Sequence, residues 1–210
     1  MEPNYQAEIR EVGESDLEKL DETLVDAFQQ DPFFEWFVPQ GRAHRRRLLI
    51  LFMWFLQTAL ERGTILATPD LAATILIMPP GKWQLGIREQ VAELQLGVRV
   101  FGVGRLLSRV AGIAALERRA PSRPHYYIPL LAADPKLRGL GVGSALLKEA
   151  LRRADSKSVP TYLENTNELN LPFYQRLGFV TTETFRMIRQ APPMWLMVRE
   201  PQNLDGGRSA

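Results

Sequence analysis

Apolar and polar residues alternate at the start of the chain and then recur with helical spacing. Residues 7–12 (AEIREV) alternate apolar with charged residues, as a half-buried strand does. The residues that follow, to about Gln30, have the spacing of an amphipathic helix, and Ser15 with Glu18 three residues later predicts a capping box at its start. The chain is therefore expected to open with a strand and a helix.

The segment DPFFEWFVPQG, residues 31–41, interrupts this pattern. Pro32 and Pro39 lie around four aromatic residues, so a loop is expected here rather than more helix. Four aromatic side chains on a loop could line a pocket, and a hydrophobic plug beneath a sheet explains them equally well.

Helical spacing returns at residues 44–62, and Gly63 is placed to end that helix. Residues 63–81 then form two short apolar runs around a Thr-Pro-Asp turn, which predicts a hairpin. Residues 83–120 are different, because their helical pattern is interrupted by glycines and contains no strand-like run. We expect an inserted helical subdomain there, serving either as a mobile lid or as a packing element.

The remainder of the chain alternates strand and helix. A length of 210 residues suits one domain with a sizeable core, so a single α/β (α+β) domain over residues 1–210 is expected. Its later elements are predicted as a strand at 125–134, a helix at 142–154, a strand at 159–165, a helix at 168–177 and strands at 178–188 and 192–201.

Composition excludes several classes of protein. Charged residues make up 24% of the chain and the net charge is +2, which favours an ordinary folded protein without a nucleic-acid partner. With no cysteine and only two histidines, neither a disulfide, a thiolate nucleophile nor a metal site is expected. The longest apolar run, residues 48–56, is too short to span a bilayer, and the first residues do not resemble a signal peptide. A cytoplasmic location without a membrane partner is expected.

Three alternate glycines follow the strand predicted at 125–134. Gly139, Gly141 and Gly143 lead directly into a helix, so backbone N–H groups and the positive end of the helix dipole meet at one point. A side chain at any of the three would block the approach of a phosphate or forbid the turn, and Arg138 could add a charge-assisted contact. The loop therefore predicts an anion site, most naturally for a diphosphate.

Two other phosphate-binding motifs fit this loop less well. A dinucleotide fingerprint would find its acidic residue in Glu164, but it needs glycine or alanine at the position of Ser144 and a first glycine directly after the strand. A P-loop is excluded because no Gly-Lys pair is followed by Ser or Thr. A dinucleotide-dependent oxidoreductase is therefore a minor alternative.

Two motifs together resemble the GCN5-related N-acetyltransferase (GNAT) family. In LAADPKLRGLGVGSALL, Arg138, Gly141 and Gly143 match the family's acetyl-CoA signature, and LENTNELNLPFYQRLGF is similar to its later motif. The two motifs cover residues 131–179 in the family's order. Within the family the chain most resembles the puromycin N-acetyltransferase branch, in which NLPFY followed by RLGF and an early DP pair near a Trp also occur. Residues 83–120 would then be the variable insert of that branch.

The resemblance implies the GNAT fold: a mixed, mostly antiparallel central sheet flanked by helices, in which two strands ending near Ala133 and Glu164 splay apart. Acetyl-CoA, as co-substrate, would lie in the splay of a core at about residues 124–199. Strand backbone would pair with the pantetheine arm, loop amides would hold the diphosphate, and Asn170 is preferred to Asn167 as a further pantetheine contact. The implied cofactor residues are Leu131, Ala132, Ala133, Arg138, Gly139, Leu140, Gly141, Val142, Gly143, Ser144, Asn170 and Tyr174.

Direct transfer of an acetyl group to an amine in a ternary complex needs a base and an acid. An alkylamine is mostly protonated at neutral pH and must lose that proton before it attacks. Glu164 is the candidate base, with Asp31 and Glu35 behind it, and the alternative is that Glu164 merely caps the following helix. Tyr174 occupies the family's general-acid position, where it would protonate the departing thiolate.

The acceptor pocket is expected to combine residues 83–120 with the segment after Gln30, in which Asp31, Phe34 and Trp36 are the candidate substrate-binding residues. A primary amine of a small molecule is the expected acceptor, because a helical lid would narrow the cleft against a peptide or protein amine. A catalytically silent CoA-binding or regulatory module is the other alternative, which the presence of both Glu164 and Tyr174 disfavours. The sequence is equally compatible with a monomer and a homodimer.

Overall fold

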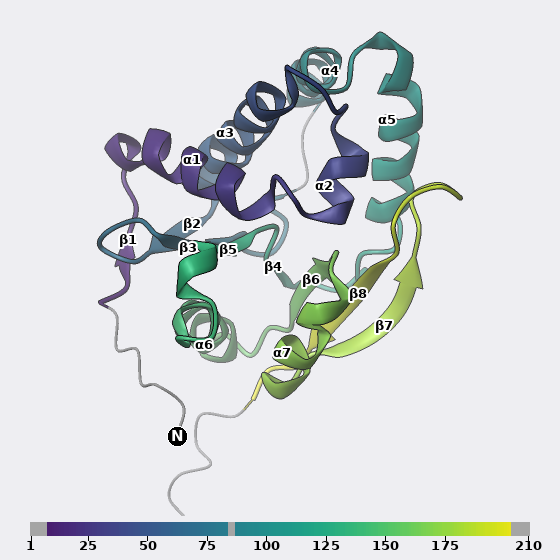
Figure 1. Ribbon diagram of the computed structural model, residues 1–210. Helices are drawn as coiled ribbons and strands as arrows, with labels where there is room; N and C mark the ends of the chain where they lie inside the picture. The colour runs from purple at the N-terminus through teal and green to yellow at the C-terminus, as the bar shows by residue number, and fades with distance from the viewer. Residues whose placement is uncertain (1–7, 84–86, 203–210) are drawn as a thin grey trace, which may run out of the picture.

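The computed structural model describes residues 8–83 and 87–202, and of residues 87–93 the backbone alone. Its α-helices are α1 (Leu17–Phe28), α2 (Pro32–Phe37), α3 (His44–Arg62), α4 (Ile87–Phe101), α5 (Val103–Glu117), α6 (Val142–Asp155) and α7 (Leu171–Arg176). Its strands are β1 (Arg10–Glu11), β2 (Thr64–Ala67), β3 (Ala73–Ile77), β4 (Tyr126–Tyr127), β5 (Leu131–Ala133), β6 (Thr161–Asn165), β7 (Val180–Phe185) and β8 (Met194–Arg199). Short 3₁₀ turns are η1 (Glu14–Asp16), η2 (Pro135–Leu137) and η3 (Glu168–Asn170). The strands lie between two groups of helices, α1 to α3 on one side and α6 with α7 on the other (Figure 1).

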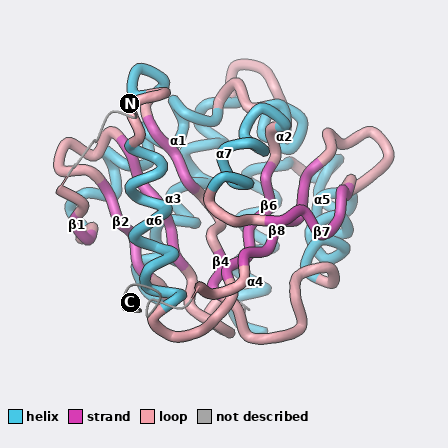
Figure 2. The backbone as a smooth tube through the Cα atoms, turned by 90° about the horizontal axis from the view of Figure 1, so that it is seen from below, coloured by secondary structure: helices cyan, strands magenta, loops and turns pink. Residues whose placement is uncertain are grey.

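The strands form two hydrogen-bonded sheets, and the chain passes from one sheet to the other between β4 and β5. The first has the order β1-β2-β3-β5 and is antiparallel, and the second has the order β4-β6-β8-β7, with β4 and β6 parallel. An isolated bridge between Met78 and Tyr127 joins the two sheets. Figure 2 shows them side by side, with β1 and β2 at one end and β7 at the other. The expected GNAT fold, a mostly antiparallel sheet with splayed central strands, is confirmed.

The strand predicted over residues 125–134 is two strands in the structure, which corrects the sequence-based expectation. β4 pairs with β6, whereas β5 pairs with β3 of the other sheet. Pro129 lies between them and has no N–H to continue the ladder, so the chain changes partner at this point. The N–H of Ile128 still donates to the carbonyl of Tyr162 at 3.0 Å, and the carbonyl of Leu130 already accepts from Leu76 at 3.0 Å.

Alternate strand residues face opposite helical layers, which gives the domain one core on each side of the strands. On one side, Leu66 and Leu163 pack with the apolar face of α6. On the other side, Ile65 and Tyr162 pack with α1, α2 and α3. This alternation is the period of two that strands require when both faces are covered.

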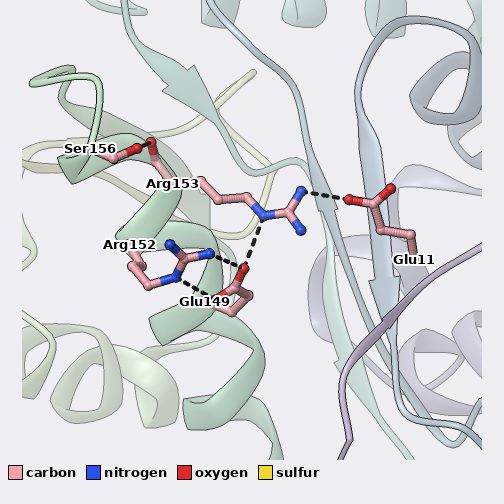
Figure 3. A network of polar contacts seen from close by, with 5 residues as sticks. All are labelled: Glu11, Glu149, Arg152, Arg153 and Ser156. Carbon is pink, nitrogen blue, oxygen red and sulfur yellow. Dashed lines mark hydrogen bonds and ion pairs between the residues drawn. The ribbon is translucent and has the colours of Figure 1, made fainter.

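Polar contacts tie the far end of α6 to the first strand. Arg153 donates to the carboxylate of Glu11 at 2.9 Å and to that of Glu149 at 3.1 Å, and Arg152 donates to Glu149 at 2.8 Å (Figure 3). The hydroxyl of Ser156 donates to the carbonyl of Arg153 at 2.8 Å. Exposed pairs of this kind contribute little stability individually, but together they fix the direction of the helix that begins at the glycine loop.

The start of α1 differs from the prediction. Asp16, rather than Ser15 with Glu18, caps this end: its carboxylate accepts from the N–H of Gly13 at 3.0 Å, and its own N–H donates to the carbonyl of Gly13 at 3.1 Å. Asp16 is also held by the guanidinium of Arg10 at 2.7 and 2.9 Å. The turn η1 precedes the helix, so the capping carboxylate, Asp16, lies two residues before Glu18, the carboxylate of the predicted capping box.

The loop predicted at residues 31–41 is partly helical, which is a second correction. Asp31 caps α2 by accepting from the N–H of Phe33 at 2.9 Å, and Pro32 occupies the first turn, where its missing N–H costs nothing. The proline that indicated a loop therefore begins a helix. Phe33, Phe34 and Phe37 are buried, so most of the aromatic cluster plugs the core.

The helical pattern of residues 83–120 is confirmed as α4 and α5. Arg109 fastens α5 to α2, because its guanidinium donates to the carbonyls of Phe37 at 3.0 Å and Trp36 at 2.6 Å. The same guanidinium lies 3.6 Å from the ring centroid of Trp36. Among the helices that the structure describes, none has both the length and the apolar character needed to cross a membrane.

Candidate active site

The glycine loop lies between η2 and α6 and has the conformation that the sequence predicts. Gly139 and Gly141 have φ angles of 80° and 81°, in the left-handed region that other residues rarely adopt. Gly143 has no such angle, and a Cβ added there would meet only the ring of Phe173, at an ordinary 3.8 Å. The turn itself therefore requires glycine at positions 139 and 141 but not at 143.

Backbone donors without acceptors converge at the start of α6. Within the described part of the chain, the N–H groups of Val142, Gly143 and Ser144 donate to no backbone carbonyl, as is usual for the first helical turn. Leu140 differs, since its N–H donates to Leu137 at 3.2 Å. The exposed Arg138 lies in the same loop. Three free donors, a helix dipole and a nearby cation form an arrangement that fits a diphosphate.

The strand before this loop has one unpaired edge. β5 pairs with β3 on one side, and none of the described strands pairs with its other side, which faces β6 across the splay. Ala132 is buried, and Leu131 and Ala133 are half-buried. An extended ligand carrying amide groups can therefore hydrogen-bond to this edge as an added strand.

Glu164 lies on β6 beside a pair of tyrosines. It is two residues beyond Tyr162, so the two side chains share one face of the strand. Tyr162 is the register partner of Tyr127, and their rings stack with centroids 5.8 Å apart. Glu164 keeps some exposed surface, yet burial raises the pKa of its carboxyl to about 7, and the neighbouring Tyr127 and Tyr162 hydroxyls offset part of that rise.

The two phenols remain protonated at neutral pH. Burial, and then the charge of Glu164, raise the pKa of both Tyr127 and Tyr162. Tyr162 is 2% exposed, and its hydroxyl has no hydrogen-bond partner among the described residues. It therefore acts on the Glu164 carboxyl as a nearby dipole rather than through a full hydrogen bond.

A second carboxylate and a third tyrosine lie at the end of the same strand. Thr166, just after β6, is 3.3 Å from the carboxylate of Asp31, and this contact ties the start of α2 to the end of β6. Burial raises the pKa of Asp31. Burial, followed by the charge of Asp31, raises the pKa of Tyr174 on α7. The structure thus brings Glu164, Asp31 and Tyr174 together around the end of β6.

The other two candidate substrate-binding residues lie elsewhere. Phe34 is 6% exposed and packs against Phe28 and Phe52 with ring centroids 5.1 and 5.0 Å apart, so it belongs to the core. Trp36 is half-buried, and the guanidinium of Arg109 covers its ring. Of the three residues on this segment, Asp31 is the one at the site.

The two asparagines of the later motif have different surroundings. The side chain of Asn167 accepts from the N–H of Leu169 at 3.0 Å and so caps η3. Asn170 is exposed, and its side chain makes no capping hydrogen bond at the start of α7. The amide of Asn170 is therefore the one that is free to contact a ligand.

Sequence reasoning missed Tyr127, Tyr162 and Thr166. Their signal was present in part, because Tyr162 and Glu164 occupy alternate positions of one predicted strand and must share a face. Tyr127 joins them only through the parallel register of β4 with β6, which no local pattern specifies.

Comparisons with known proteins agree with this geometry. The sequence profile described as the Acetyltransferase (GNAT) family matches residues 85–179. An uncharacterized N-acetyltransferase of Schizosaccharomyces pombe is 26% identical over 210 residues, which cover 92% of this chain and 83% of that protein. The crystal structure of histone acetyltransferase HPA2 and related acetyltransferase from Corynebacterium glutamicum has a TM-score of 0.71 and 27% identity, covering 92% of this chain and 96% of that one. Arylalkylamine N-acetyltransferase 2 from Aedes aegypti has the same fold, with a TM-score of 0.63, 14% identity and coverage of 94% and 100%.

Proposed function

Since the chain is an N-acetyltransferase of the GNAT family, we propose that it transfers the acetyl group of acetyl-CoA directly to the primary amine of a small molecule. The observation that carries the proposal is the buried carboxyl of Glu164, whose pKa is about 7, at the open end of the splayed strands. A carboxyl in that position can accept a proton at neutral pH beside a bound thioester.

The residues around the glycine loop fit the co-substrate. The free N–H groups of Val142, Gly143 and Ser144 would hold the diphosphate, with Arg138 as a charged contact. The unpaired edge of β5 (Leu131–Ala133) would hydrogen-bond to the pantetheine amides, and Asn170 would add a side-chain contact. The N–H of Ala133, which alternates with the β3-bonded positions 132 and 134 and so lies on the unpaired edge, would polarise the thioester carbonyl, on which negative charge develops.

Glu164 would take the proton of the attacking amine. An alkylammonium group has a pKa of about 10, so a carboxyl of pKa 4.5 accepts its proton at a cost of about 7 kcal/mol. Burial brings the pKa of Glu164 to about 7 and lowers that cost to about 4 kcal/mol. Asp31 is the second candidate base, since burial also raises its pKa.

Tyr174 would act on the leaving side of the reaction. As the amine nitrogen bonds to the carbonyl carbon, the carbon–sulfur bond breaks and the sulfur gains negative charge. The raised pKa of Tyr174 keeps its hydroxyl protonated, so the hydroxyl can donate a hydrogen bond or its proton to that sulfur. Tyr174 then regains its proton from solvent.

A small acceptor is supported by what surrounds Glu164. Its face of β6 is occupied by the stacked rings of Tyr127 and Tyr162, and α5 is fastened to α2 by Arg109. The same fold in an arylalkylamine acetyltransferase favours a small acceptor, whereas the similarity to histone acetyltransferase HPA2 and related acetyltransferase of Corynebacterium glutamicum favours a protein amine as the alternative. The closer resemblance to puromycin N-acetyltransferases rests on the NLPFY and RLGF residues and stays a prediction.

The test is to incubate the purified protein with acetyl-CoA and a panel of primary amines, and to detect the acetylated products by mass spectrometry together with thiol release. Acetylation of at least one small amine is expected, with large loss in the Glu164→Gln variant. Acetylation of peptides alone would move the acceptor to the protein class. No product, combined with a melting temperature that rises with acetyl-CoA, would instead identify a silent CoA-binding module.

A further inference from the structure

A cavity at the far end of α6 takes no part in the proposed reaction. It has a volume of about 390 Å³ and is bordered by the second half of α6, the end of α7 and the end of β8 with the residues that follow it. Its charged side chains are four cations, Lys148, Arg152, Arg176 and Arg199, and one carboxylate, Asp155. The glycine loop lies at the opposite end of the same helix, about 20 Å from Asp155 at roughly 1.5 Å per residue.

The carboxylate in this cavity is already neutralised. Both terminal nitrogens of Arg199 donate to Asp155, at 2.7 and 2.9 Å. The backbone N–H of Gln202 also donates to Asp155, at 2.9 Å. These contacts join the end of α6 to the end of β8 and leave Asp155 no charge to offer the other cations.

Two of the remaining cations have no counter-charge. Arg152 is paired with Glu149 at 2.8 Å (Figure 3). Lys148 and Arg176, in contrast, are exposed and form no ion pair with any residue that the structure describes. The cavity is therefore electropositive, which favours an anionic ligand.

The buried guanidinium of Arg199 keeps one donor free. Arg199 is 5% exposed, and its Nε is buried without a hydrogen-bond partner among the described residues, because the pair with Asp155 uses only the two terminal nitrogens. Buried donors are normally satisfied by protein, water or an ion. The free N–H in the wall of an electropositive cavity therefore points to an acceptor atom inside it.

Gly178 leaves room for that acceptor. A Cβ atom built on Gly178 would lie 3.4 Å from Nε of Arg199 and 3.4 Å from the side-chain nitrogen of Gln202. Among the described residues, Gln202 forms hydrogen bonds only through its backbone N–H, so its side-chain amide is free. The space that a side chain would fill at position 178 is thus bordered by two free donors, which an oxygen atom can accept from together.

A neighbouring cavity that shares Gly178 and Gln202 provides a comparison. Its two arginines, Arg119 and Arg123, are paired with Glu183 and Glu200 respectively. Cations of the neighbouring surface are therefore balanced, and the excess positive charge is specific to the cavity at α6.

We propose that this cavity is a second anion site, which binds a phosphate group, either as inorganic phosphate or as the monoester of a small molecule. Nε of Arg199 and the amide of Gln202 donate to its oxygens, and Lys148 and Arg176 balance its charge. A phosphate group carries about −1.5 to −2 charges at pH 7, which matches the two unpaired cations better than a carboxylate does. The site is separate from the glycine loop and from the acetyl transfer.

The experiment is calorimetric titration of inorganic phosphate, and separately of glucose 6-phosphate, into protein saturated with CoA at constant ionic strength. CoA occupies the glycine loop, so heat from either titrant reports a different site. The wild type is expected to bind phosphate at a single site, and its melting temperature should rise with the titrant. Tighter binding of the free ion identifies inorganic phosphate as the ligand, and tighter binding of the ester identifies a phosphorylated molecule.

The variants change exposed residues, so each should melt at the wild-type temperature without ligand. Lys148→Gln combined with Arg176→Gln should weaken phosphate binding about tenfold or more, and Gln202→Glu should do the same by repulsion. Lys19→Gln removes an exposed cation on α1, across the strands, and is the matched control, with an expected change of less than about twofold. Arg199 is kept, because its loss would leave Asp155 buried without a partner.

Three results would overturn the inference. The first is no binding of either titrant to the CoA-saturated wild type, and the second is equal binding in the wild type and the double variant. The third is a parallel loss of CoA affinity in the double variant, since the cavity would then belong to the co-substrate site. None of these results affects the proposed function, which is tested separately by acetylation of amines.

Discussion

Replacing Glu164 with Gln should make the folded protein more stable at pH 8 while removing activity. Glutamine has nearly the shape of the protonated carboxyl but cannot ionise. The buried carboxyl of Glu164 has a folded-state pKa of about 7, against an ordinary value of 4.5. Ionisation is therefore harder in the folded protein than in the unfolded chain, and the variant escapes that cost.

The magnitude follows from the two pKa values. At pH values below 4.5 the carboxyl is protonated in both states and contributes no difference. As the pH rises from 4.5 to 7, the unfolded chain ionises first and the folded state is progressively destabilised, by about 3 kcal/mol at pH 8. For a chain of this length, a difference of about 3 kcal/mol corresponds to roughly 6–12 °C in melting temperature.

The assay is calorimetric unfolding of the wild type and Glu164→Gln at pH 5 and at pH 8. The difference in melting temperature should be small at pH 5 and large at pH 8, with the variant the more stable. Asp31 and Asp21, whose pKa values are also raised by burial, are common to both proteins and cancel in the comparison. An equal difference at the two pH values would refute the reasoning, because the effect would then be one of packing and not of charge.

Four further substitutions test other parts of the structure. Tyr174→Phe should lower kcat at least tenfold and leave the dissociation constant of acetyl-CoA within about twofold, as measured by steady-state kinetics and calorimetric titration; an equal loss of both would make the residue structural. Gly141→Ala should lower the free energy of unfolding by about 1–2 kcal/mol, because the φ angle of Gly141 is 81°. Gly143→Ala should change stability little. A denaturant titration in which Gly143→Ala is the less stable of the two would contradict the loop geometry. Arg109→Ala should lower the free energy of unfolding by about 3 kcal/mol, because the carbonyls of Trp36 and Phe37 lose their donor and the ring of Trp36 loses its cation. An unchanged urea midpoint would show that Arg109 does not hold α5 to α2.

The elements with a strong local signal were predictable from the sequence. The period of 3.6 gave the helix at 44–62 and the helix after the glycine loop, and the two apolar runs around Thr-Pro-Asp gave the β2–β3 hairpin. In each case, residues that are close in the sequence are sufficient to form the element. The glycine turn was predictable for the same reason, since its positive φ angles are a local property.

The errors arose where a distant segment decides the local structure. Pro32 begins α2 because Asp31 caps it and because the aromatic side chains of this segment are buried in the core. The run at 125–134 becomes two strands because each half meets a different partner. The sequence-based prediction of the site was incomplete for a similar reason. Tyr127 lies near Glu164 only because β4 pairs with β6, and no local pattern specifies the register between these separate parts of the chain.

The most direct test of the account is the ratio of kcat/KM in the wild type to that in Glu164→Gln, measured against pH with one acetylated amine. Because both proteins share the ionisation of the amine, the ratio isolates the carboxyl. If Glu164 takes the proton, the ratio rises about tenfold per pH unit below about pH 7 and is constant above it. The constant value of the ratio should be roughly 10²–10⁴. A ratio close to one at every pH would contradict the central claim and transfer the role of base to Asp31.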